Sequence, residues 1–127
     1  MKIRAEEPRP ELVIKTAKMT FYAGLEKNKT AAEFIKKLSP ESLDVKPCGD
    51  GGLKTGEMIW DLPESGDMIE CSTGDIVYGS DGCLTFCFEP AQIRGVKLAH
   101  FYEGRAEELY KELQSDPAVR LSLEWSE

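Results

Sequence analysis

The stretch that decides the fold is GDIVYGSDGCLTFCF, residues 74–88, which has the pattern of two strands joined by a tight turn. Ser80-Asp81-Gly82 is typical of such a turn, because glycine tolerates positive φ and Asp can hydrogen-bond to its own backbone. In the second strand Leu84, Phe86 and Phe88 alternate with Cys83, Thr85 and Cys87. Both faces are only weakly polar, so we expect this hairpin to lie at the centre of the core.

Length and composition place the chain among small globular proteins. Its 127 residues predict one domain over 1–127, with residues 1–10 as an extended lead-in. The net charge of −7 argues against a nucleic-acid partner, because phosphate binding needs clustered Lys and Arg. The sequence has no apolar run of about 18 residues and no apolar signal core at its N-terminus, so we expect a cytoplasmic protein with no membrane partner.

The four cysteines, Cys48, Cys71, Cys83 and Cys87, have no paired CxxC spacing. Cys83 and Cys87 fall four positions apart on one predicted strand, about 13 Å between α-carbons at ~3.3 Å per residue. Two ligands of one zinc ion each need a sulfur about 2.3 Å from the metal, which one straight strand cannot supply. We therefore expect free thiols, no metal site and no cofactor.

Alternation of apolar and polar residues predicts further strands on both sides of the hairpin. They cover residues 12–14, 19–25, 57–60, 68–71, 96–102 and 119–126, with a weak strand over 41–46 and a loop over 91–95. A Gly-rich connection covers residues 48–53. The closing strand, 119–126, has the clearest alternation, and we expect it to pair with the first strands.

Two short helices are predicted between the strands. In the first, over 30–38, Thr30 is the expected N-cap, Glu33 completes a capping box and Pro40 ends the helix. The second covers residues 105–114, where an apolar stripe repeats at helical spacing. Seven or eight strands with two helices indicate a mainly β barrel or sandwich.

The order of these elements resembles the prokaryotic cyclophilin-like domains. The similar segments are TAAEFIKKL (residues 30–38), GEMIW (56–60), GDIVY (74–78) with LTF (84–86), and FYEG (101–104) entering a helix. The resemblance covers about residues 11–124. It implies a closed eight-stranded β-barrel with a short helix capping each open end.

The resemblance also raises the question of prolyl isomerase activity. Cyclophilins proper use an arginine on a strand, beside a Phe, to weaken amide resonance across a barrier of ~18–20 kcal/mol. The corresponding segment here, residues 56–61, contains no arginine. The five arginines lie elsewhere: Arg4, Arg9, Arg94, Arg105 and Arg120.

Four side chains are the candidate ligand-binding residues: Met58, Trp60, Tyr78 and His100. The first three could line a shallow apolar groove on the outer wall, where cyclophilins bind peptides, although ordinary core packing accounts for the same residues. His100 is the only histidine, and no spacing places a Cys or Ser beside it. Glu57 and Asp61 are about 13 Å apart on a strand, too far for the carboxylate pair of a glycosidase. No catalytic residue is predicted.

The sequence therefore predicts a non-catalytic module that binds a small molecule or a peptide. One alternative is a prolyl isomerase with weak or residual activity, and another is a structural protein that forms a homo-oligomer.

Overall fold

The computed structural model describes residues 10–39, 41–49, 51–63 and 66–125, so most of the predicted lead-in and Pro40 lie outside the described residues. Within these ranges the chain forms nine strands, two α-helices and one turn of 3₁₀ helix, η1 (Glu103–Arg105). The strands are β1 (Pro10–Lys15), β2 (Thr20–Leu25), β3 (Leu43–Val45), β4 (Leu53–Glu57), β5 (Met68–Cys71), β6 (Asp75–Gly79), β7 (Cys83–Cys87), β8 (Ala91–Phe101) and β9 (Val119–Trp125). The helices are α1 (Lys29–Leu38) and α2 (Ala106–Ser115).

The predicted central hairpin is confirmed. Strands β6 and β7 pair antiparallel, every residue of β6 is buried, and β7 also pairs with β4. Gly82 has φ +82 and donates its N–H to the Gly79 carbonyl, while the Asp81 carboxylate accepts the N–H of Cys83. The turn chemistry of Asp81 and Gly82 thus fixes the register that buries both faces of β7.

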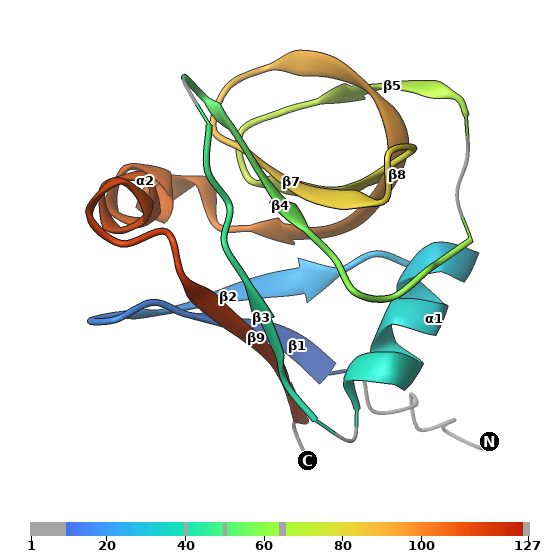
Figure 1. Cartoon of the computed structure of the whole chain (residues 1–127), viewed down its shortest axis with the longest axis horizontal. Coiled ribbons are helices and arrows are strands. Elements are labelled where there is room, and N and C mark those ends of the chain that lie inside the picture. Colours follow the sequence, from blue (N-terminus) through green and yellow to red (C-terminus); the bar gives the residue numbers. More distant parts are fainter. Residues whose placement is uncertain (1–9, 40, 50, 64–65, 126–127) are drawn as a thin grey trace, which may run out of the picture.

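The strand pairing corrects the expectation of a closed eight-stranded barrel. All pairs are antiparallel, in the order β3-β9-β1-β2-β8-β6-β7-β4, with β5 added beside β8. Among the described residues no ladder joins the two end strands, β3 and β4. A single bridge links Cys48 to Thr55, and the two strands diverge from the connection between them (Figure 1). Because β3 has only three residues and β4 ends at Glu57, neither strand is long enough to close the sheet along its length.

The prediction that β9 returns to the first strands is confirmed by its pairing with β1 over six residue pairs. Two strand boundaries were wrong. The strand expected over 57–60 lies earlier, as β4, because Lys54 and Gly56 face the interior and Met58 leaves the strand. The loop expected over 91–95 is the first part of β8, where it pairs with β5.

Helices α1 and α2 lie on opposite sides of the strands (Figure 1). The cap of α1 differs from the prediction: Asn28 is the N-cap, and its Oδ1 accepts the N–H of Ala31 at 2.8 Å. Thr30 lies inside the helix, and its hydroxyl donates to the Pro63 carbonyl at 2.7 Å. The residue expected to cap the helix therefore anchors a neighbouring loop. Neither helix of the described part is long and apolar enough to span a bilayer.

A β-bulge in the pairing of β6 with β8 changes which side chains face the core. The register shifts between Ile76 and Val77, where the partners change from Ala99 to Lys97. Leu98, Ala99 and Phe101 are all buried in the main core, which simple alternation does not allow. The bulge leaves His100 directed away from that core and half-exposed.

Candidate functional site

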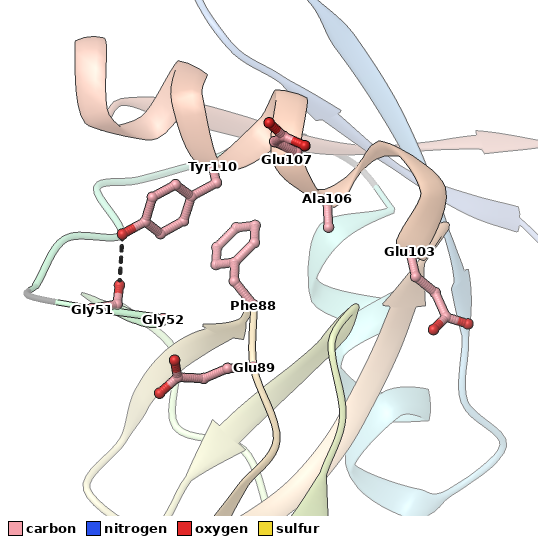
Figure 2. Close-up of a pocket in the computed structure, with 8 residues that line it drawn as sticks. All are labelled: Gly51, Gly52, Phe88, Glu89, Glu103, Ala106, Glu107 and Tyr110. Carbon is pink, nitrogen blue, oxygen red and sulfur yellow. Dashed lines mark hydrogen bonds between the residues drawn. The ribbon is translucent and has the colours of Figure 1, made fainter.

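A pocket of about 500 Å³ opens between the start of α2, the connection between β3 and β4, and the segment that follows β7. We call it the aromatic pocket; its lining residues are Gly51, Gly52, Phe88, Glu89, Glu103, Ala106, Glu107 and Tyr110 (Figure 2). Three segments that are far apart in the sequence thus meet at one site. The volume falls within the range of small-molecule sites in proteins.

Two aromatic rings form the apolar part of this pocket. Phe88 and Tyr110 meet edge to face with centroids 5.3 Å apart, and Phe88 also contacts Phe101 at 5.5 Å. The Tyr110 hydroxyl donates to the Gly51 carbonyl at 3.2 Å (Figure 2). Phe101 belongs to the core and fixes the position of Phe88. The loop that contains Gly51 fixes the position of Tyr110 through the hydrogen bond.

A cation already contacts one of these rings. The Lys54 ammonium lies 4.8 Å from the centroid of Tyr110 and donates a hydrogen bond to the Gly49 carbonyl. The aliphatic part of this side chain is enclosed, since Lys54 as a residue is only 6% exposed. The Tyr110 ring is therefore placed where its electron-rich face can interact with positive charge.

The charged side chains that line the aromatic pocket are all carboxylates. Glu89 lies against Gly52, where a side-chain Cβ would meet the Glu89 carboxyl group at 2.5 Å. Glu103 and Glu107 come from the turn and helix on the other side of the pocket, and both are largely exposed. No lysine, arginine or histidine is among the lining residues, but Lys54 lies on the Tyr110 ring and Lys111 pairs with Glu107 at 3.5 Å. Three glutamates against these two lysines leave one negative charge in excess around the described pocket.

A polar cluster around Asp75 adjoins the pocket at Glu103. The Asp75 carboxylate, which is nearly inaccessible, accepts a hydrogen bond from the Ser72 N–H at 2.8 Å and pairs with the Lys97 ammonium at 3.3 Å. It also meets Nδ1 of His100 at 2.8 Å, and Nε2 of the same ring lies 3.9 Å from Glu103. Asp75 thereby fixes the orientation of the imidazole, which reaches the rim of the aromatic pocket.

The pKa of Asp75 lies below the usual range for a carboxyl group. Burial acts to raise this pKa, but the Ser72 N–H, His100 and Lys97 together outweigh it by stabilising the charged form. A carboxyl group with a depressed pKa in the folded state stabilises the protein above its unfolded-state pKa of about 3.9. That contribution is lost as the pH falls through the folded-state pKa.

Replacing Asp75 with asparagine is expected to lower the free energy of unfolding by about 1–2 kcal/mol at pH 7, because Lys97 and His100 lose their charged partner but stay partly hydrated. The difference between wild type and variant should shrink between about pH 4 and pH 2. Urea unfolding at several pH values measures it. Asp61→Asn, at an exposed position, serves as the control. A difference that is constant down to pH 2 would contradict the assignment.

Of the four sequence-predicted site residues, His100 does not share a groove with Met58, Trp60 and Tyr78. Trp60 packs edge to face against Phe34 of α1, with centroids 6.4 Å apart, and Met58 also packs against the main core. Tyr78 is 1% exposed, and its hydroxyl accepts the Leu62 N–H at 3.1 Å. In the ladder between β6 and β8, Tyr78 pairs with Val96 and His100 pairs with Asp75. Tyr78 and His100 are therefore about 10–13 Å apart along the strands. Binding at Met58 and Trp60 stays a prediction.

The cysteines are free thiols in very different surroundings. Cys71 and Cys87 are buried together in a small second cluster with Val77. Burial raises the pKa of both thiols, most strongly that of Cys87, where proximity to Cys71 adds to the effect. Burial also raises the pKa of Cys83, followed by repulsion from Asp81 and Glu57, whereas Cys48 is exposed.

A titration of the thiols with an aromatic disulfide reagent at pH 7 should therefore resolve cysteines that react at different rates. We expect Cys48 to react fastest, and Cys71 and Cys87 to react only after unfolding, because the thiolate is the reacting form and both sites exclude the reagent. The variant Cys48→Ser should lack the fast phase. Rapid modification of Cys87 in the native protein would contradict this prediction.

A second, larger hollow of about 930 Å³ lies where β3 and β4 diverge. Its lining carries basic and acidic side chains, including the exposed ion pair of Arg120 with Asp44, and no aromatic residue. It therefore lacks the aromatic rings that distinguish the aromatic pocket. Among the described residues no group of three His, Cys, Asp or Glu side chains is arranged to hold a metal ion.

Sequence reasoning missed the aromatic pocket. Phe88 continues the apolar face of the second hairpin strand, and Tyr110 lies on the apolar stripe predicted over residues 105–114, so neither is distinguished by its spacing from a core residue. Glu103 and Glu107 are ordinary residues for the start of a helix. Asp75 carried no signal, because a single acidic residue at the start of a strand does not predict burial. Only the folded chain brings these segments together.

The fold and the pocket define a small antiparallel β-domain with a site of ligand size beside one helix. The chain matches the model of the cyclophilin-like family over residues 14–124 and belongs to that family. The resemblance seen in the sequence is thus confirmed at the level of the family. Comparison with curated proteins and with solved structures gave no significant match.

Proposed function

We propose that this protein is a non-catalytic binding module and that the aromatic pocket takes a small molecule or a peptide side chain. The observation that carries this proposal is the pocket itself, about 500 Å³, with two aromatic rings in contact and carboxylates at its rim. Apolar walls with a few polar groups are typical of sites that bind organic ligands. Family membership alone does not indicate a ligand, because one fold carries many functions.

The positions of the described arginines support the non-catalytic part of the proposal. Arg94 donates to the Gly66 carbonyl, Arg105 stacks on the ring of Phe21, and Arg120 pairs with Asp44. None of these contacts involves Met58 or Trp60. The prolyl isomerase alternative needs a guanidinium beside a bound proline, and each of these three groups is engaged elsewhere.

The proposal is tested by screening a library of small organic fragments and short peptides for binding to the protein. The affinity of each ligand found is then compared between the wild type and the variant Tyr110→Ala. Tyr110 is half-exposed at the pocket, whereas Tyr22, on β2, is an exposed aromatic residue with no part in the pocket. We expect ligands of the wild type to bind at least about tenfold more weakly to Tyr110→Ala and equally well to the Tyr22→Ala control. Ligands that bind all three proteins equally would contradict the proposal.

A further inference from the structure

We infer that the ligand of the aromatic pocket is an organic cation, an ammonium or guanidinium group carried on an apolar body. This inference rests on the proposed function and adds the chemical class of the ligand. It is drawn from three features of the described residues: the sign of the lining charges, the position of the aromatic rings, and the cation that one ring already receives.

The charges that line the pocket select against anions. Glu89, Glu103 and Glu107 approach from two sides of the cavity. The N-terminal end of α2 also lies at the pocket and contributes a partial positive charge of about half a unit. Glu107 lies in the first turn of the helix and pairs with Lys111 at 3.5 Å, and Lys54 lies on the Tyr110 ring. Three glutamates against two lysines leave one negative charge in excess, which still outweighs the partial charge of the helix end. The excess negative charge therefore disfavours a carboxylate or phosphate ligand and favours an ammonium group beside Glu89 or Glu103, neither of which pairs with a lysine among the described contacts.

The rings of Phe88 and Tyr110 provide the second contribution to the binding of a cation. An ammonium or guanidinium over an aromatic face within about 6 Å of the centroid is attracted by the ring quadrupole. Lys54 meets this geometry on Tyr110, and its hydrogen bond to the Gly49 carbonyl holds its ammonium in place. Phe88 has no described cation over its ring and lies beside Glu89 in the chain. A bound cation can therefore contact Phe88 and a glutamate together while its apolar body packs against Tyr110.

Three probes with the same aromatic body isolate the effect of charge: phenethylamine, which is a cation at pH 7, 2-phenylethanol, which is neutral, and phenylacetate, which is an anion. Their affinities are measured on the full chain by two-dimensional amide NMR titration at low ionic strength. We expect phenethylamine to bind about tenfold more tightly than 2-phenylethanol and phenylacetate to bind most weakly. Added salt should narrow the gap between the amine and the alcohol.

A triple variant, Glu89→Gln with Glu103→Gln and Glu107→Gln, keeps the shape of the pocket and removes its carboxylates. All three side chains are exposed, so the variant should fold, and its thermal unfolding confirms this. Phenethylamine is expected to bind this variant only as tightly as 2-phenylethanol binds the wild type. The matched control is Glu33→Gln on α1, a surface glutamate outside the pocket, which should change neither affinity.

The outcomes separate this inference from the proposed function. If 2-phenylethanol or phenylacetate binds at the pocket as tightly as phenethylamine, the cation inference is wrong and the binding function stands. If the triple variant keeps full affinity for the amine, the inference is also wrong. If none of the three probes shifts the amides of the pocket residues at about 10 mM, both the inference and the proposed pocket are overturned.

Discussion

Replacing Gly95 with alanine is expected to lower the free energy of unfolding by about 3 kcal/mol, because the added methyl group would collide with backbone atoms. Gly95 lies on β8 opposite Gly79 of β6. A Cβ at this position would lie 2.4 Å from the Tyr78 carbonyl oxygen and 2.9 Å from the Gly79 α-carbon. The two strands would have to separate at the centre of the sheet to admit it.

Gly24→Ala is the matched control for this experiment. Gly24 lies on β2, and apart from its chain neighbours no residue has a heavy atom within 4 Å of the place that a Cβ would take. The alanine there should change stability by less than about 1 kcal/mol in either direction, since it meets no obstacle and restricts the unfolded chain. Urea unfolding measures both variants. Equal stability of Gly95→Ala and Gly24→Ala would show that β6 and β8 are not packed as closely as described.

Replacing Phe86 with alanine should have the largest effect of all, a loss of about 3–5 kcal/mol in the free energy of unfolding. Phe86 lies on β7, the strand with two buried faces, and its side chain is fully buried in the main core. Removing the ring leaves a cavity that the paired strands on both sides cannot collapse to fill.

The variant Phe86→Leu separates lost volume from lost aromaticity. It keeps an apolar side chain of similar bulk and should lose distinctly less stability than Phe86→Ala. Denaturant unfolding with a check for native amide dispersion measures both. A loss below about 1 kcal/mol for Phe86→Ala would mean that the hairpin is not the centre of the core.

Much of the fold could be predicted from local patterns. Leu84 and Phe86 alternate with Thr85 and Cys87 along the strand that follows the turn at Gly82. These signals were sufficient to predict the hairpin of β6 and β7. The helices and the strand pairing of β9 with β1 followed from periodicity in the same way. Local alternation is reliable here because each of these elements has one clear pattern over its whole length.

The rest depended on long-range contacts. Met58 and Trp60 follow the end of β4 although their alternation predicts a strand. Met58 packs against the main core, and Trp60 packs against Phe34 of α1. The bulge that puts both Leu98 and Ala99 into the core has no signature in single-residue alternation. Closure of the sheet likewise depends on the lengths of β3 and β4, which the sequence does not define at their ends.

The candidate site, too, depends partly on local patterns and mostly on long-range contacts. Of the four predicted residues, His100 reaches the rim of the aromatic pocket through Glu103, and Tyr78 is enclosed in the core. The site that the structure offers combines residues near positions 51, 88 and 103–110. No spacing rule joins such segments, because their proximity arises from the sheet order and from the placement of α2.

The most direct test of the binding site is an NMR measurement of intermolecular nuclear Overhauser effects between phenethylamine and the side chains of the protein. If a ligand occupies the aromatic pocket, the probe should show contacts to the rings of Phe88 and Tyr110 and to the backbone of Gly52. Contacts confined to Met58 and Trp60, or the absence of any contact to the two pocket rings at saturating probe, would contradict the account.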